Sequence, residues 1–156
     1  MFSHTARAII LVYLVSHCRG FISLVSRMLL RNKYGIECST RKIGFGLMLP
    51  HPRNIIISAE VIGDNVQINQ NVTIGGNMKK TINRGFDDIQ KLPRLGNNVV
   101  IYTNSVIGGP VIINDNVIIG ANCVCTHDIE CNTLMYNNCS ISKKKIIVKQ
   151  GAYNTI

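Results

Sequence analysis

Aliphatic residues recur at intervals of six through most of the chain after residue 42. They stand at Ile43, Leu49, Ile55, Ile62, Ile68 and Ile74 and, after an interruption, at Leu95, Ile101, Ile107, Ile113 and Ile119, with Cys125 and Cys131 continuing the series. A unit of six residues matches no helical period and is too short for a strand and an ordinary loop. It fits one flat side of a triangular solenoid, with one short strand on each side. Three sides, about eighteen residues, make one complete turn, which we call a coil.

Two further positions repeat in phase with this series. Four positions after most of its members comes a second apolar or small residue: Val66, Val72, Val99, Ser105, Val111, Val117, Cys123 and Ile129. Three positions after comes an amide or acid: Asn65, Asn71, Asn77, Asn98, Asn104, Asn116, Asn122 and Asp128. Because asparagine tolerates the left-handed backbone better than most residues, we expect these positions to form the corners of the coil. Successive coils should stack at strand spacing, about 4.8 Å, with an aliphatic core.

The repeats resemble a known family. Ile62-Gly63-Asp64-Asn65-Val66, Ile74-Gly75-Gly76 and Ile119-Gly120-Ala121-Asn122 are similar to the hexapeptide-repeat acyltransferases, which have a left-handed parallel β-helix. The resemblance covers residues 36–142 and supplies the left hand, since the general rule for parallel crossovers favours the right hand. We therefore predict a mainly β protein whose central domain, residues 36–142, is a left-handed β-helix.

The repeat is broken twice. Ile55 and Ile62 are seven positions apart, so we expect one extra residue to bulge there. Twenty-one positions separate Ile74 from Leu95, and the intervening residues 78–94 are polar and charged. We predict that residues 78–94 leave the coil as a loop, which either covers a binding surface or is a tolerated insertion.

The two ends of the chain lie outside the repeat. Residues 1–35 contain two apolar runs, Ala8–Val15 and Phe21–Leu30, which we interpret as short helices that are retained in the mature protein. They are too short to span a bilayer. They either pack on the rest of the protein or place residues 8–31 on the inner surface of a membrane. Residues 143–156 form a basic tail.

Charge and cysteine content narrow the function classes. A formal charge of +9 favours acidic partners, but no basic run interleaved with aromatic residues and no zinc-finger spacing is present, so we do not expect nucleic acid binding. The six cysteines form no CxxC pair, which is typical of buried thiols in a reducing cytoplasm. We therefore expect a cytoplasmic protein without a metal site, located in the cytoplasm or at the inner face of the membrane.

Histidine is the side chain best suited to activate an alcohol for acyl transfer near neutral pH. The chain has four: His4, His17, His51 and His127. His51 stands in Leu49-Pro50-His51-Pro52 after the Ile43-Gly44-Phe45-Gly46 turn. This arrangement resembles the serine acetyltransferase branch of the family, and the resemblance makes His51 the catalytic base. We interpret His127 as a surface residue at a corner.

The resemblance also implies a carboxylate that orients the histidine from fifteen positions earlier. That position is Ile36 here, and Glu37 is next to it. Adjacent residues of a strand point to opposite faces, so Glu37 serves only if the coil is displaced by one residue. We name Glu37 as the candidate partner of His51, with Glu60 or a backbone carbonyl as alternatives.

The resemblance implies acetyl-coenzyme A as donor, bound in a groove between neighbouring subunits of a homotrimer. The matching small turn residues are Gly75, Gly76, Thr103, Ser105, Gly120 and Ala121, where short side chains allow close approach of the cofactor. Lys143 and Lys144 are candidates for contact with its phosphates, or belong to a solvated tail.

The acceptor is the least constrained part of the prediction. Pro50 replaces the acidic residue, and Lys91-Leu92 replaces the Arg-His pair, that hold serine in serine acetyltransferases. The chain is similar instead to short O-acetyltransferases of capsule and O-antigen clusters, so we predict O-acetylation of a sugar hydroxyl on a bacterial surface polysaccharide precursor. The alternatives are a serine O-acetyltransferase of cysteine biosynthesis and a non-catalytic β-helix scaffold.

Overall fold

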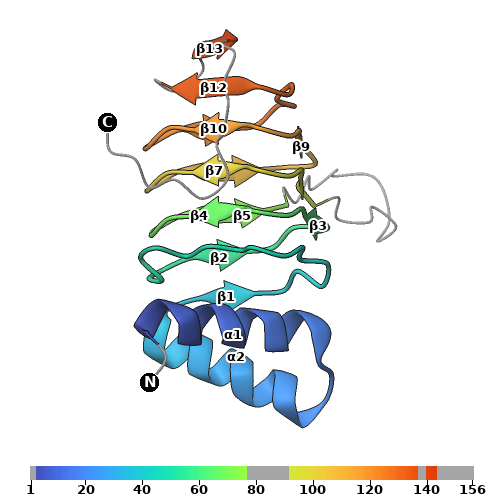
Figure 1. The fold of residues 1–156 in the computed structure, drawn as a ribbon, viewed down its shortest axis with the longest axis vertical. Helices are drawn as coiled ribbons and strands as arrows, with labels where there is room; N and C mark the ends of the chain where they lie inside the picture. The colour runs from blue at the N-terminus through green and yellow to red at the C-terminus, as the bar shows by residue number, and fades with distance from the viewer. Residues whose placement is uncertain (1–2, 77–91, 137–139, 144–156) are drawn as a thin grey trace, which may run out of the picture.

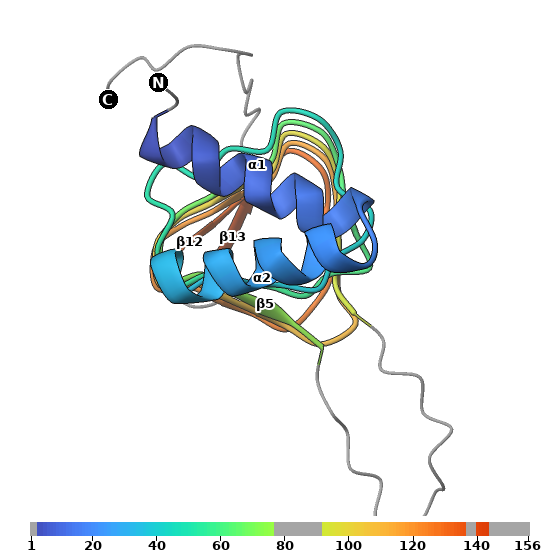
Figure 2. The same ribbon diagram turned by 90° about the horizontal axis from the view of Figure 1, so that it is seen from below.

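The computed structural model describes residues 3–76, 92–136 and 140–143. Flat coils of short strands stack along one axis, and two helices lie across the amino-terminal end of the stack (Figure 1). Seen along the axis, the coils superpose on one another behind the two helices (Figure 2). The predicted architecture, a mainly parallel β-helix with two short helices before it, is confirmed.

The strands form three sheets, one for each side of the coil. Sheet A consists of β1 (Glu37–Cys38), β2 (Ile56–Ile57), β5 (Thr73–Gly75), β8 (Val106–Gly108) and β11 (Val124–Cys125). Sheet B consists of β3 (Val61–Ile62), β6 (Arg94–Leu95) and β9 (Ile112–Ile113). Sheet C consists of β4 (Gln67–Ile68), β7 (Val100–Ile101), β10 (Ile118–Ile119), β12 (Thr133–Tyr136) and β13 (Ser140–Lys143). The chain visits the sheets in the order A, B, C in each coil.

The second residue of each two-residue strand points into the coil. The predicted aliphatic positions from Ile43 to Cys125 are all buried, and so are the eight positions that follow them by four residues. Strand register stacks like over like, as in the pairing of Ile74 with Ile107 and of Ile107 with Cys125. Removing this column of side chains from water is the main favourable term in folding such a coil, because a solenoid has no other core.

The repeat ends earlier than the sequence predicts. Cys131 is exposed, so its assignment to the buried column was wrong. Ile129 instead forms a bridge to Ile113 of sheet B. These two residues are sixteen positions apart, whereas Ile113 and its partner in the preceding coil, Leu95, are eighteen positions apart. The last coil is therefore two residues shorter, and the residue that reaches the core beside Ile119 is Met135.

Asparagine forms the corners, as predicted. Six predicted positions have φ between 54° and 61°: Asn65, Asn71, Asn98, Asn104, Asn116 and Asn122. Asn54 and Asn132 adopt the same conformation, although the repeat did not predict them. Asp128 does not, and its carboxylate accepts a hydrogen bond from the Ile112 N–H at 2.7 Å. Asn77 lies outside the described residues.

The corner asparagines also form a ladder along the axis. The Asn71 amide donates to Asn104 Oδ1 at 2.9 Å, and the Asn104 amide donates to Asn122 Oδ1 at 3.1 Å. Each asparagine therefore contributes both a tolerated left-handed backbone and a hydrogen bond to the next coil.

Replacing Asn104 with Ala should remove both contributions. Alanine in the left-handed region costs about 1–2 kcal/mol, and the lost ladder bonds add about 1 kcal/mol. We expect Asn104→Ala to lower the free energy of unfolding by about 2–3 kcal/mol in chemical denaturation. Asn104→Gly keeps the permitted backbone and loses only the ladder, so it should cost less. Equal losses for the two variants would contradict this account of the corner.

Both predicted helices are present and extend beyond the predicted apolar runs. Helix α1 spans His4–His17, and its cap residue Ser3 accepts a hydrogen bond from the Ala6 N–H at 3.1 Å. Helix α2 spans Phe21–Tyr34 and ends at Gly35, which has φ 65°. A Cβ atom at Gly35 would lie 2.5 Å from Asn54 Oδ1, so glycine satisfies both the backbone and the packing of the first coil.

The helices close the amino-terminal end of the core. Ala8, Val12 and Leu30 are fully buried, and Tyr34 is almost so. The Tyr13 hydroxyl donates to the Gly44 carbonyl at 2.7 Å and accepts from the Leu47 N–H at 3.2 Å, which fixes α1 on the first coil. Packing of this segment on the rest of the protein is therefore confirmed. Neither α1 nor α2 is long and apolar enough to cross a bilayer.

The first break in the repeat lies elsewhere than predicted. Ile57, rather than Ile55, pairs with Ile74 in sheet A. Met48 pairs with Gln67, and Ile56 pairs with Thr73, of the next coil. Met48 and Ile56 are eight positions apart in the chain, whereas Gln67 and Thr73 are six positions apart. The prediction of a bulge between Ile55 and Ile62 was wrong, and the two additional residues extend the corner between sheets C and A.

The structure changes two predicted boundaries, the end of the loop and the end of the parallel coil. Strand β5 ends at Gly75 and β6 begins at Arg94, so Arg94 belongs to the coil and not to the loop. Residues 78–91 of the predicted loop lie outside the described residues. Strand β13 runs antiparallel to β12 and includes Lys143, so the parallel coil stops at β12 instead of continuing to residue 142.

Candidate active site

The extended corner between sheets C and A carries His51. Prolines on both sides stiffen it, because each fixes its own φ and holds the preceding residue in an extended conformation. Pro52 is buried, and the Arg53 N–H donates to the His51 carbonyl at 2.8 Å, which closes a tight turn. His51 itself is exposed. The sequence therefore builds a rigid turn that presents one imidazole at the surface.

Three predicted donor-site residues share this corner with His51. Backbone hydrogen bonds connect successive coils there, from Asn71 N–H to the Arg53 carbonyl at 3.1 Å and from Asn122 N–H to the Thr103 carbonyl at 3.0 Å. Thr103, Gly120 and Ala121 accordingly line the corner above the His51 turn. A Cβ atom at Gly120 would approach the Met135 carbonyl to 3.1 Å, so this turn is closely packed against the coil above it.

Of the other predicted donor-site residues, Ser105 belongs to the same corner but points inward, whereas Gly75 and Gly76 lie at another corner. Ser105 is fully buried, and its hydroxyl donates to the Gly120 carbonyl at 2.7 Å, so its side chain faces the core. Gly75 and Gly76 lie at the end of β5, at the next corner of the coil. A Cβ atom at Gly75 would meet nothing within 4 Å, which leaves open space beside this backbone. Lys143 ends β13, and Lys144 lies outside the described residues.

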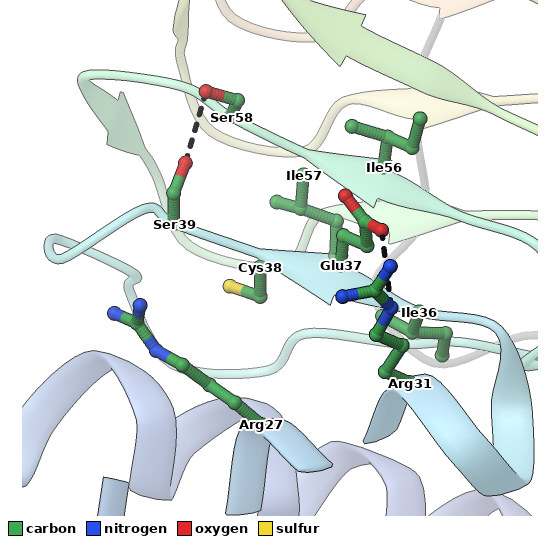
Figure 3. A pocket seen from close by; sticks show the side chains of 9 residues that line it. All are labelled: Arg27, Arg31, Ile36, Glu37, Cys38, Ser39, Ile56, Ile57 and Ser58. Carbon is green, nitrogen blue, oxygen red and sulfur yellow. Dashed lines mark hydrogen bonds and ion pairs between the residues drawn. The ribbon is translucent and has the colours of Figure 1, made fainter. Parts of the chain in front are cut away.

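The two carboxylates proposed to orient His51, those of Glu37 and Glu60, form ion pairs with arginines in the monomer. Ile36 is buried, with 1% of its surface exposed. Glu37 pairs with Arg31 at 3.7 Å (Figure 3), and Glu60 pairs with Arg94 at 3.9 Å. Within residues 3–76 and 92–136, the His51 ring forms no hydrogen bond. The orienting group for His51 is thus not supplied by these contacts within one protomer.

Sequence reasoning missed a pocket beside Glu37. It has a volume of about 450 Å³ and lies between α2 and the outer face of β1 and β2 (Figure 3). Arg27, Arg31 and Glu37 supply its charges, and the Ser39 hydroxyl donates to the Ser58 hydroxyl at 2.9 Å on its far side. No spacing in the sequence relates α2 to β2, so only the folded chain reveals this pocket.

The remaining reactive side chains are poor candidates for chemistry. Burial raises the pKa of the Cys38 and Cys125 thiols, so both are protonated and unreactive near neutral pH. His127 is exposed, and its carbonyl accepts from the Cys125 thiol at 3.2 Å. In the described part of the chain, no three His, Cys, Asp or Glu side chains gather as metal ligands would.

The comparisons with known proteins agree with the fold. Residues 93–127 match the model of the bacterial transferase hexapeptide family, six repeats. The chain is a left-handed hexapeptide β-helix. No curated protein matches its sequence.

Solved structures similar to this β-helix include serine acetyltransferases. The enzyme from Neisseria gonorrhoeae is 23% identical with a TM-score of 0.69, over 91% of this chain and 54% of that one. Serine acetyltransferase 1 from Entamoeba histolytica is 25% identical with a TM-score of 0.66, over 83% and 50%. The soybean enzyme complexed with serine is 24% identical with a TM-score of 0.69, over 87% and 54%. The β-helix spans about half the length of these structures.

Proposed function

We propose that the β-helix is an O-acetyltransferase that uses acetyl-coenzyme A, with His51 as the general base. One observation carries the proposal: the rigid His51 turn places an exposed imidazole on the same corner as the small turn residues Thr103, Gly120 and Ala121. The hexapeptide transferase repeat and the similarity to serine acetyltransferase structures support it.

The proposed reaction follows from that placement. A ring nitrogen of His51 takes the proton from the acceptor hydroxyl, and the resulting oxygen nucleophile attacks the thioester carbonyl. Backbone N–H groups at the corner stabilise the negative charge on the carbonyl oxygen. The tetrahedral intermediate then expels the thiolate, which receives the proton from His51. One acetyl ester and one free thiol are formed for each thioester consumed, and the histidine is regenerated.

We further propose that the protein is a homotrimer whose donor groove lies between neighbouring protomers. The outer face of sheet A carries the column Ile56, Thr73, Val106 and Val124, in which the three aliphatic members are 41%, 37% and 46% exposed in the monomer. A column of this kind is typical of a surface that a partner covers. Light scattering should give a mass three times the 17.3 kDa of one chain, and Val106→Glu with Val124→Glu should give the monomer mass. A monomeric wild-type protein would contradict the trimer.

Glu37 lies on the same outer column of sheet A, opposite Ile56 in register. We propose that Glu37 is a positioning residue for His51 of the partner subunit, because a protomer seated on this face would meet the Glu37 carboxylate. Glu37→Gln should lower kcat by about tenfold with KM and the melting temperature nearly unchanged, and Glu37→Asp should recover part of the loss. Unchanged kcat in Glu37→Gln would remove Glu37 from the site.

Two acceptors have specific support. Serine is supported by the comparisons, since the similar structures include serine acetyltransferases, of which the soybean and the Neisseria gonorrhoeae enzymes are each found in complex with serine. A sugar hydroxyl of a polysaccharide precursor is supported by Pro50, because it replaces the acidic residue next to the histidine in the serine enzymes and an uncharged acceptor does not need that charge. The comparisons favour serine as the first acceptor to be tested.

An assay of thiol release from acetyl-coenzyme A distinguishes between the two proposed acceptors. Purified protein is supplied with L-serine in one reaction and with repeat-unit oligosaccharide in another, and mass spectrometry identifies the acetylated product. Efficient turnover with serine alone would establish the serine enzyme and reject the sugar acceptor, and the opposite result would reject serine. Release of thiol with neither acceptor and without His51 dependence would contradict the proposed chemistry.

A further inference from the structure

Helix α2 is amphipathic in the opposite sense to an ordinary surface helix. Its buried face holds Ser23 and Ser26 together with Leu30 and Tyr34. Its exposed side carries the stripe Phe21, Leu24 and Met28, which are 79%, 57% and 57% exposed and spaced by three and four residues. Ile22 and Leu29 widen the apolar surface, with 54% and 48% exposed. A helix that buries serine and exposes phenylalanine and leucine is expected to contact something apolar.

The surface around this stripe is positively charged. Residues 1–36 contain five Arg or Lys and no Asp or Glu. A groove of about 570 Å³ runs beside Leu24, and Arg19, Arg27 and Arg41 line it. Arg31 is neutralised by Glu37, whereas these three arginines form no ion pair within the described residues. Three guanidinium groups next to an apolar stripe match the two parts of an anionic phospholipid, its phosphate and its acyl chains.

The position of α2 favours a flat partner. Both helices lie across the amino-terminal end of the coil, where α2 is accessible along its length (Figure 2). A second copy of the chain is a poorer occupant, because a symmetric contact between two α2 faces would bring the unpaired arginines of one copy against those of the other. An anionic surface would instead neutralise these arginines, whereas a second copy would add to the repulsion between them.

We propose that the exposed face of α2, with the arginine groove beside it, is a docking surface for an anionic phospholipid bilayer. The apolar stripe enters the boundary between headgroups and acyl chains, and Arg19, Arg27 and Arg41 bind the lipid phosphates. The protein is thereby held on a cytoplasmic membrane face without crossing it. This inference is independent of the acceptor and of the role of His51.

Vesicle flotation tests the surface. Wild-type protein should float with vesicles of phosphatidylglycerol and phosphatidylethanolamine, remain in solution with phosphatidylcholine alone, and be released by salt. A variant with Phe21, Leu24 and Met28 all changed to Ser keeps the net charge and should lose most of the binding. A variant with Arg19, Arg27 and Arg41 all changed to Gln should lose about fivefold in affinity for each arginine. Because the six side chains lie on the surface, circular dichroism should show both variants folded.

The matched control removes exposed aromatic surface elsewhere. Phe45 and Tyr136 are 85% and 42% exposed and lie outside α2, so changing both to Ser should leave flotation unchanged. The proposal is overturned if wild-type protein fails to float with anionic vesicles, or if the α2 serine variant floats as well as wild type. It is also overturned if that variant has a smaller assembly in sedimentation, because α2 would then bind a second copy of the chain.

Discussion

His51→Ala should lower kcat by about 100- to 10,000-fold, which is the usual contribution of a general base, while the affinity for coenzyme A stays nearly unchanged. The reason is structural. His51 is exposed and forms no hydrogen bond within the described residues, so the fold does not depend on its ring. Pro50 and Pro52 hold the turn, and neither is altered. Initial rates of thiol release and calorimetric titration with coenzyme A measure the two quantities.

His127 provides the matched control for this variant. It is an exposed histidine at a different corner, in the last coil, and His127→Ala should leave kcat within about twofold of wild type. Equal losses in the two variants would contradict the assignment of the base. A His51→Ala protein that also loses coenzyme A binding would show that His51 binds the donor instead of activating the acceptor.

Ile101→Ala should have the largest effect on stability among single substitutions in the sheets. Ile101 is fully buried in β7, with Ile68 below it and Ile119 above it in sheet C. Removing three carbons from the middle of a stacked column leaves a cavity that the rigid coils cannot close, which costs about 2–5 kcal/mol. Chemical denaturation monitored by circular dichroism should show this loss in the free energy of unfolding.

Phe45→Ala is the control for the cavity. Phe45 is larger than Ile101 but 85% exposed, so its removal should change the free energy of unfolding by no more than about 0.5 kcal/mol. If Phe45→Ala destabilised the protein as much as Ile101→Ala, burial in the coil would not determine stability as described above.

The fold could be predicted because a solenoid repeats one local rule. Every coil needs an inward aliphatic residue and a left-handed corner, so the positions of Ile68, Ile101 and Asn104 follow from spacing alone. The hand came from family resemblance, since spacing does not distinguish left from right. The spacing rule failed at Cys131 because the last coil is two residues shorter than the coil before it, so that Ile129 and Met135 point inward instead.

The candidate site was predictable only in part. The His51 turn is visible in sequence because two prolines flank the histidine, but the length of its corner required the strand register. The pocket formed by Arg27, Arg31 and Glu37 depends on where α2 lies on the first coil, which no repeat specifies. The apolar stripe on α2 was also ambiguous, since the sequence alone did not tell which apolar residues α1 and the coil would cover.

Calorimetric titration of wild-type protein with coenzyme A tests the central claim most directly. We predict saturable binding of one coenzyme A per chain, because the β-helix is proposed to hold the acyl donor beside the corner that carries His51. Absence of binding would leave a β-helix scaffold without a donor site and would contradict the proposed acetyltransferase.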